Sequence, residues 1–247
     1  MKFSANLGFL WTDLSLPEGI RAAKAAGFDA VECHWPYETP IEEVQTALRE
    51  TGLSMLGLNT IKGETNGLSA VVGMEDEAKQ AIDSAITYAT EINAGCIHVM
   101  AGFTNGSDKA EETFRDNLKY ACSKTDKTIL IEPLNTKDAP GYHLTRLDHA
   151  LTIVDELGLE NLKIMFDCYH MEIMEGDLAG NLKRSLPHVG HIQFANTPDR
   201  GEPDQGDIDF KALFKTVADL GWTTPLGAEY KPRRTTQEGL GWLTSYR

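Results

Sequence analysis

Amphipathic segments alternate with short apolar runs along the whole chain. In one such segment Ala78, Ile82 and Ala85 recur with other apolar residues at spacings of three and four, which predicts a helix with one buried face. A glycine follows the helical pattern at several places, namely Gly27, Gly52, Gly95, Gly158 and Gly221. Because glycine readily adopts the left-handed conformation that caps a helix, the repeated unit is predicted to be helix, glycine cap and strand.

The apolar runs that follow these helical segments predict eight strands. They are Phe3–Asn6, Ala30–Cys33, Ser54–Asn59, Cys96–Met100, Thr128–Glu132, Leu162–Asp167, Val189–Phe194 and Leu226–Tyr230. Most are apolar on both faces, as parallel strands covered by helices are. Eight strands that alternate with helices over 247 residues predict a single (β/α)8 TIM barrel domain spanning residues 1–247. The alternative is a doubly wound open sheet, which the lack of a glycine-rich phosphate turn after the first strand disfavours.

The connections between the predicted elements differ in length and polarity. Turns from helix to strand are a few residues long, whereas the connections from strand to helix at 60–73, 101–108 and 134–144 and after Phe194 are long and polar. TIM barrels build their active sites from the loops at the carboxyl ends of the strands. The polar loops therefore predict which end of the barrel carries the site.

Polar residues end four of the predicted strands, from the fifth to the eighth: Glu132, Asp167, Gln193 and Glu229. Carboxylates that follow buried strands are costly to bury unless they are paired, protonated or bound to a cation. Three carboxylates and an amide oxygen make an all-oxygen set, which suits a hard cation such as Mg²⁺ or Mn²⁺. The alternative is a group of ion-paired acids without a metal.

Four basic or titratable residues lie near these strand ends. His170 is predicted to orient a substrate hydroxyl, with capping of its loop as the alternative, and His98 is either a ligand or a hydrogen-bonded core histidine. Arg200 offers a fork that matches a substrate carboxylate, unless it is a surface residue of its loop. Lys231 either joins it in binding substrate or balances a neighbouring acid. The residues after the second strand are interpreted as packing residues, with an apolar wall over a small substrate as the alternative; they are His34, Trp35 and Tyr37.

The charge balance restricts the class of partner. The chain has 23 Lys and Arg residues against 37 Asp and Glu residues, a formal net charge of −14. Nucleic-acid-binding surfaces are basic, so no nucleic acid partner is expected, and an anionic substrate needs a local cation to hold it. No apolar run is long enough for a signal peptide or a membrane span, which predicts a cytoplasmic protein without membrane contact. The oligomeric state stays open, a homo-oligomer included.

Cysteine usage and short motifs narrow the chemistry further. The four cysteines form no CxxC pair, which indicates reduced thiols, and Cys168 is a poor candidate for a nucleophile. The sequence has no GxSxG elbow, HExxH helix or P-loop, so the commonest hydrolase and nucleotide-binding classes are disfavoured. We expect neither a nucleotide nor a flavin cofactor. Acid–base chemistry with a metal at a barrel mouth remains.

Several stretches of the sequence resemble the hydroxypyruvate isomerase family, which belongs to the xylose isomerase-like TIM barrels. They are ANLGFLWTD, AAKAAGFDAVE, IEPLN, FDCYH, HIQFANTPDRGEPDQGDIDF and AEYKPRRTTQEGLGW. The resemblance runs from residue 3 to near residue 243 without a large gap. It implies isomerisation of a small anionic keto acid, hydroxypyruvate to tartronate semialdehyde. A close relative within the family acts on 2-oxo-tetronates, and these motifs do not separate the two.

The resemblance also implies roles for single residues. Glu132 and Glu229 match the family's two catalytic glutamates, and Asp167 and Gln193 match the other two positions of its metal site. Sugar epimerases of the same superfamily usually have a histidine in place of Gln193, so the glutamine fits the hydroxypyruvate branch. The implied mechanism passes through an enediolate, and one glutamate removes a proton from C3 while the other serves C2.

Three other functions stay open. A ketose 3-epimerase would use the same frame on neutral sugars. A metal-dependent phosphodiesterase or DNA-repair nuclease would need more histidine ligands and a basic groove, which the net charge disfavours. A non-catalytic sugar-acid binding protein would keep Arg200 but would have no need of two opposed glutamates.

Overall fold

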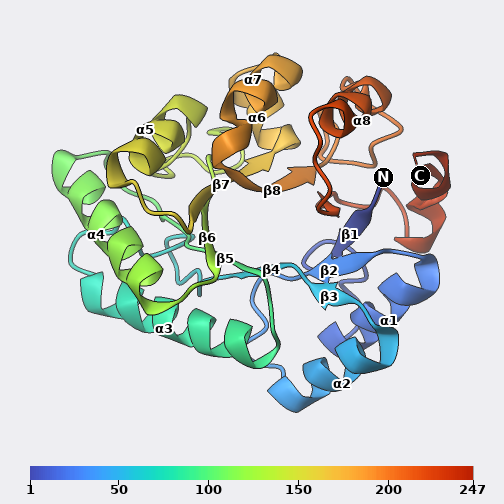
Figure 1. The fold of residues 1–247 in the computed structure, drawn as a ribbon, viewed down its shortest axis with the longest axis horizontal. Helices are drawn as coiled ribbons and strands as arrows, with labels where there is room; N and C mark the ends of the chain where they lie inside the picture. Colours follow the sequence, from blue (N-terminus) through green and yellow to red (C-terminus); the bar gives the residue numbers. More distant parts are fainter. Residues whose placement is uncertain (247) are drawn as a thin grey trace.

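Parallel strands form a ring at the centre of the molecule, and helices surround it (Figure 1). The computed structural model describes residues 1–246. The strands are β1 (Phe3–Asn6), β2 (Ala30–Glu32), β3 (Ser54–Met55), β4 (Gly57–Asn59), β5 (Cys96–His98), β6 (Thr128–Ile131), β7 (Leu162–Asp167), β8 (Val189–Phe194) and β9 (Leu226–Ala228). The predicted strands are confirmed to within two residues at each end.

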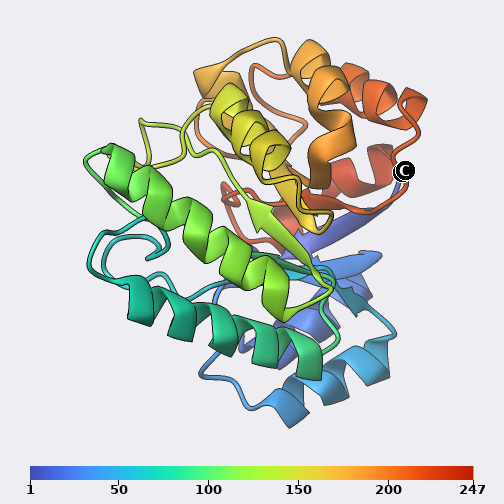
Figure 2. The same ribbon diagram turned by 60° about the vertical axis from the view of Figure 1, so that its left-hand side comes forward.

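The helices alternate with these strands and cover the outside of the ring, as the turned view also shows (Figure 2). They are α1 (Leu16–Ala26), α2 (Ile41–Thr51), α3 (Glu75–Glu91), α4 (Asp108–Lys124), α5 (Leu147–Leu157), α6 (Cys168–Met174), α7 (Leu178–Ser185), α8 (Phe210–Asp219) and α9 (Gly241–Ser245). Short 3-10 turns lie at Leu186–His188 and Gln237–Gly239. Within residues 1–246 there is no helix with the length and apolar character needed to cross a membrane.

The nine strands occupy eight positions of a barrel. Their order is β3-β2-β1-β9-β8-β7-β6-β5-β4, and every pairing is parallel. The two ends of this order, β3 and β4, are consecutive in the chain and are separated only by Leu56. The Leu56 N–H donates to the Val31 carbonyl at 2.7 Å, and its carbonyl accepts from the Cys96 N–H at 2.8 Å. The predicted strand Ser54–Asn59 is therefore hydrogen-bonded to β2 on one side and to β5 on the other, which closes the ring. The predicted (β/α)8 barrel is confirmed.

The predicted glycine caps are confirmed at four of the five positions. Gly27, Gly52, Gly158 and Gly221 have left-handed backbones, with φ of 96°, 67°, 61° and 81°.

The prediction is wrong at Gly95. Helix α3 ends at Glu91, and Asn93, with φ of 53°, takes the left-handed conformation that asparagine tolerates. Gly95 already leads into β5, and its N–H donates to the Met55 carbonyl at 3.1 Å.

The loops at the carboxyl ends of the strands are long, as predicted, with one exception. Strand β7 runs directly into α6, and the side chain of Asp167 accepts from the Tyr169 N–H at 2.9 Å to cap this short helix. Asp167 thus ends a strand and begins a helix, which fixes the position of its carboxylate.

Candidate active site

The four polar residues predicted at strand ends lie together at the carboxyl end of the barrel. Asp167 is the partner of Gln193 in the β7–β8 register, and Gln193 is the partner of Gly227 in the β8–β9 register. Glu132 directly follows β6, and Glu229 directly follows β9. All four side chains are buried. We call Glu132, Asp167, Gln193 and Glu229 the barrel-mouth cluster.

Arg200 reaches into this cluster from the loop after β8. Its Nη2 lies 3.3 Å from Asp167 Oδ2 and 2.5 Å from Glu229 Oε2. Its guanidinium lies over two aromatic rings, 4.7 Å from the centroid of Phe9 and 5.0 Å from that of Tyr169. The side chain is only 13% exposed, so the arginine is part of the site and not a surface residue of its loop.

Glu229 is held by two further side chains that the sequence analysis did not assign to the site. Asn6 Nδ2 donates to Glu229 Oε1 at 2.9 Å, and His34 Nε2 lies 2.9 Å from the same oxygen. Asn6 ends β1 in the same way as the predicted residues end their strands, so the strand-end pattern could have identified it. His34 was interpreted as a packing residue, and its ring does pack edge-on against Phe9.

Both predicted histidines lie beside the carboxylates. His98 Nδ1 is 3.6 Å from Glu132 Oε2, and His170 Nε2 is 3.5 Å from Asp167 Oδ2. The Asn135 N–H donates to His170 Nδ1 at 3.0 Å, so the neutral ring carries its proton on Nε2 and presents it to the cluster. Burial lowers the pKa of both histidines to about 3, with the charge of Arg200 adding to the shift at His170. His170 is thus placed as a neutral hydrogen-bond donor.

A buried glutamate that the sequence analysis did not single out orients Gln193. Gln193 Nε2 donates to Glu32 Oε1 at 3.0 Å, and His191 Nε2 lies 2.5 Å from Glu32 Oε2. Gly227 makes room for this contact, because a Cβ there would lie 2.5 Å from Glu32 Oε1 and 2.8 Å from Gln193 Cγ. With its amide nitrogen held by Glu32, Gln193 keeps its oxygen Oε1 free of hydrogen bonds within residues 1–246.

The donor atoms that remain fit a divalent cation. Among the described residues, Glu132 Oε1, Gln193 Oε1 and both ring nitrogens of His98 are buried without a hydrogen-bond partner. Ligand atoms of Glu132, Asp167 and His170 also lie within 4.8 Å of one another. Buried polar atoms without partners are costly, and a bound cation would satisfy the oxygens.

The environment separates the proton affinities of the carboxyl groups. Burial, together with the charges of Glu229 and Asp167, raises the pKa of Glu132 well above its usual value. Burial raises the pKa of Asp167 to about 7 although Arg200 opposes the shift. Burial would also raise the pKa of Glu229, but the charge of Arg200 and the hydrogen bond from His34 outweigh it, and this pKa lies below its usual range. The surroundings thus raise the proton affinity of Glu132 and lower that of Glu229.

Two other residues considered from the sequence lie outside the cluster. The Lys231 side chain is exposed, and its backbone N–H donates to the Arg200 carbonyl at 2.7 Å. Cys168 is buried in α6, and burial raises the pKa of its thiol. A nucleophilic thiol needs access and a lowered pKa, so the structure gives Cys168 no such role.

Comparisons with known proteins agree with this geometry. The profile of the family described as "Xylose isomerase-like TIM barrel" matches residues 20–246. The chain is 40% identical to 2-oxo-tetronate isomerase of Cupriavidus necator, over 99% of this chain and 98% of that protein. It is 36% identical to hydroxypyruvate isomerase of Escherichia coli, over the full length of both proteins. A crystal structure named AP endonuclease, family 2, from Brucella melitensis matches with a TM-score of 0.96 and 34% identity, over 100% of this chain and 99% of that one.

The fold, the strand-end residues and these full-length matches agree with one another. They show that the chain belongs to the xylose isomerase-like TIM barrel family, on the branch that contains the hydroxypyruvate and 2-oxo-tetronate isomerases.

Proposed function

We propose that the protein is an isomerase that interconverts a small 2-keto-3-hydroxy acid and its aldehyde isomer through an enediolate. Hydroxypyruvate and 2-oxo-tetronate are the two substrates to test, because the full-length relatives carry these names. The observation that carries the proposal is the pair of buried glutamates, Glu132 and Glu229, which directly follow β6 and β9 at the barrel mouth and whose surroundings shift their pKa values in opposite directions. Two titratable groups whose environments push their pKa values apart are the usual signature of an acid and a base.

The directions of the two pKa shifts support one allocation of the proton transfers. Glu229, whose pKa is lowered, takes a proton from C3 of hydroxypyruvate, and Glu132, whose pKa is raised, passes a proton to C2. The hydroxyl proton on O3 moves to O2, so that substrate and product have the same composition, and transfer of a proton from Glu229 back to Glu132 through solvent restores the enzyme for the next turnover. General acid–base catalysis contributes about 10²–10⁴-fold, so stabilisation of the enediolate charge must supply much of the remaining acceleration.

Arg200 and His170 bind the substrate in this scheme. The substrate carries a carboxylate, and Arg200 is a buried cation that contacts the barrel-mouth cluster. His170 donates a hydrogen bond from its Nε2–H to a substrate oxygen. His98 contacts Glu132 from the β5 side and completes the wall of the site. Lys231 is exposed and contributes at most a long-range charge.

We further propose that the barrel-mouth cluster binds Mg²⁺ or Mn²⁺. Glu132, Asp167, Gln193 and Glu229 would hold the ion, since their oxygens suit a hard cation and two of them lack a hydrogen-bond partner among residues 1–246. A divalent ion bound there would supply Lewis-acid chemistry, which stabilises negative charge on substrate oxygens. Gln193 Nε2 donates a hydrogen bond to Glu32, which leaves the amide oxygen Oε1 at the other end of the group available to the ion.

The name of the Brucella melitensis structure raises DNA as a second substrate class. The net charge of −14 disfavours it, because binding of a phosphate backbone needs a basic surface.

Proton exchange followed by NMR in D₂O tests the proposal. The protein is incubated with hydroxypyruvate, and separately with 2-oxo-tetronate, each with and without EDTA. We expect deuterium at the carbon beside the carbonyl together with aldehyde product, and loss of both with EDTA. If neither acid exchanges while a neutral ketose does, the protein is an epimerase and the proposal is wrong. Full activity in EDTA, with no metal detected in the protein, would refute the proposed cation but not the proposed isomerase activity.

A further inference from the structure

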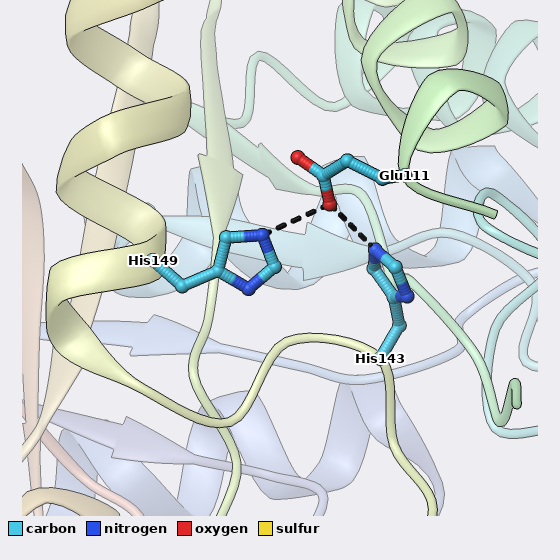
Figure 3. A group of neighbouring side chains, drawn as sticks. All are labelled: Glu111, His143 and His149. Carbon is cyan, nitrogen blue, oxygen red and sulfur yellow. Dashed lines mark hydrogen bonds and ion pairs between the residues drawn. The ribbon is translucent and has the colours of Figure 1, made fainter. Parts of the chain in front are cut away.

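A second group of titratable side chains lies away from the barrel-mouth cluster, between helices α4 and α5. Glu111 comes from α4, His143 from the loop after β6, and His149 from α5. We call these three residues the α4–α5 cluster. Nε2 of His143 and Nε2 of His149 each lie 2.9 Å from the same oxygen, Glu111 Oε2 (Figure 3). The ligand atoms of all three lie within 4.8 Å of one another.

The ring of His143 is held in place before any ligand binds. Its Nδ1 lies 3.1 Å from the hydroxyl of Thr104, and its ring packs edge-on against Phe114 at 5.5 Å. Its backbone N–H donates to the Gly102 carbonyl at 2.9 Å, which ties the loop after β6 to the loop after β5. In metal sites the ring nitrogen of a histidine that does not hold the ion is hydrogen-bonded to a neighbouring group, a role that the Thr104 hydroxyl fills for Nδ1 of His143.

The carboxylate of Glu111 is available to a cation although an arginine lies beside it. Arg115 Nε lies 2.6 Å from Glu111 Oε1, the oxygen that does not contact the histidines. The same arginine is also paired with Glu156, at 2.8 Å from Nη1. Hydrogen bonds from the histidines and Arg115 outweigh burial, and the pKa of Glu111 lies below its usual range. The charge of Arg115 is shared between Glu111 and Glu156, so it does not neutralise Glu111 alone.

We propose that Glu111, His143 and His149 form a binding site for a transition-metal ion of the Zn²⁺ type, separate from the barrel mouth. Two imidazole nitrogens and one carboxylate oxygen are a donor set that suits zinc and its neighbours, and differs from the oxygen-rich cluster in the barrel. His149 is one-third exposed, so the open side of the site faces solvent and leaves room for water as a fourth ligand.

Such an ion would link three segments that are distant in sequence. It would join α4, the loop after β6 and the start of α5, and a ligand that binds only the folded state stabilises that state. The expected effect is on stability, because the cluster contains none of the residues that we assign to proton transfer. This inference does not depend on the proposed isomerase activity.

The test is a zinc titration of the EDTA-treated full-length protein by calorimetry, with a matched set of variants. In His149→Gln we expect the affinity of this site to fall by at least about 100-fold, since loss of even an outer-shell partner costs about 10–100-fold. The matched control is His188→Gln, because His188 is 31% exposed and pairs with a single carboxylate at 3.3 Å. It should bind as many zinc ions as the wild type, and one more than His149→Gln.

Two further measurements make the result independent of folding defects and of zinc at the barrel mouth. Glu111→Gln, checked for its native circular dichroism spectrum, should lose the same binding event. Anomalous diffraction from a zinc-soaked crystal should place an ion about 2.0–2.2 Å from the three ligand atoms. Equal zinc stoichiometry and affinity in the wild type, His149→Gln and Glu111→Gln, or anomalous density at the barrel mouth alone, would overturn the proposal.

Discussion

Replacing Arg200 by glutamine removes the buried cation that we assign to the substrate carboxylate. Its Nη2 contacts Asp167 at 3.3 Å and Glu229 at 2.5 Å, and 13% of its side chain is exposed. A hydrogen bond to a charged group contributes about 1.5–3 kcal/mol, and each 1.36 kcal/mol is tenfold in rate, so kcat/KM should fall by about 10- to 150-fold. The loss should appear mainly in KM, because the carboxylate is bound in both the ground state and the transition state.

The matched control is Lys231→Gln, which removes a positive charge from the same mouth of the barrel. Its side chain is exposed, so a change in kcat/KM of less than about threefold is expected from long-range charge alone. Arg200→Lys keeps the charge but loses the fork, and should fall between the two. Steady-state kinetics with hydroxypyruvate and with 2-oxo-tetronate give both constants. Equal losses in Arg200→Gln and Lys231→Gln, or an Arg200→Gln enzyme within twofold of the wild type, would refute the assignment.

Stability gives an independent measure of the same arginine. Removal of one partner from a buried ion pair costs about 3–5 kcal/mol, because the remaining carboxylates stay buried without a counter-charge. We expect a loss of this size in the free energy of unfolding of metal-free Arg200→Gln, measured by urea denaturation. Added Mn²⁺ should recover part of it, since a cation in the barrel-mouth cluster restores the positive charge. A variant as stable as the wild type in EDTA would contradict the buried contacts.

Three other predictions follow from the pKa directions. In D₂O, Glu229→Gln should lose exchange at C3 of hydroxypyruvate, whereas Glu132→Gln should retain C3 exchange and lose aldehyde product; the reverse pattern would exchange the two roles. Burial raises the pKa of Cys96 to about 11 and that of Cys122 to about 12, so a thiol reagent at pH 8 should react slowly with the native protein and rapidly in denaturant. The pKa of Glu111 is lower in the folded protein than its usual value of 4.5, so the ionised carboxylate stabilises the fold above pH 4.5 and this contribution is lost as the pH falls. The free energies of unfolding of the wild type and Glu111→Gln should therefore differ by less than about 1 kcal/mol at neutral pH, and the difference should vanish in acid.

The strand ends show what a sequence of this kind can predict. Three acids follow apolar runs in the sequence: Glu132, Asp167 and Glu229. Because the parallel strands of a barrel bring their carboxyl ends together, this pattern predicts that the three side chains lie close to one another. The same argument applied to the first two strands would have found Asn6 and Glu32. The sequence analysis considered only the fifth to eighth strands, and so missed these two residues.

Other features depend on tertiary contacts that no local pattern contains. Gln193 faces the site because Glu32, 161 positions away in the chain, holds its amide nitrogen. Likewise His143 is held near Glu111 by backbone pairing between the loops after β5 and β6, and His149 reaches the same carboxylate from α5. Short motifs cannot report such contacts, since the partners lie on different elements and the spacing between them has no fixed value.

The packing of Trp242 has a consequence for how the protein is made. This buried residue in α9 packs edge-on against Phe3 of β1 and Phe194 of β8, with ring centroids 5.1 and 5.5 Å apart. Strand β1 also lies between β2 and β9, so its second edge stays unpaired until β9 has been synthesised. At roughly 5–20 residues per second, a nascent chain needs roughly 12–48 s to reach Trp242 after Phe3 has emerged. For that time the first strand exposes apolar surface that a chaperone can bind, and a chain truncated before α9 would expose it permanently.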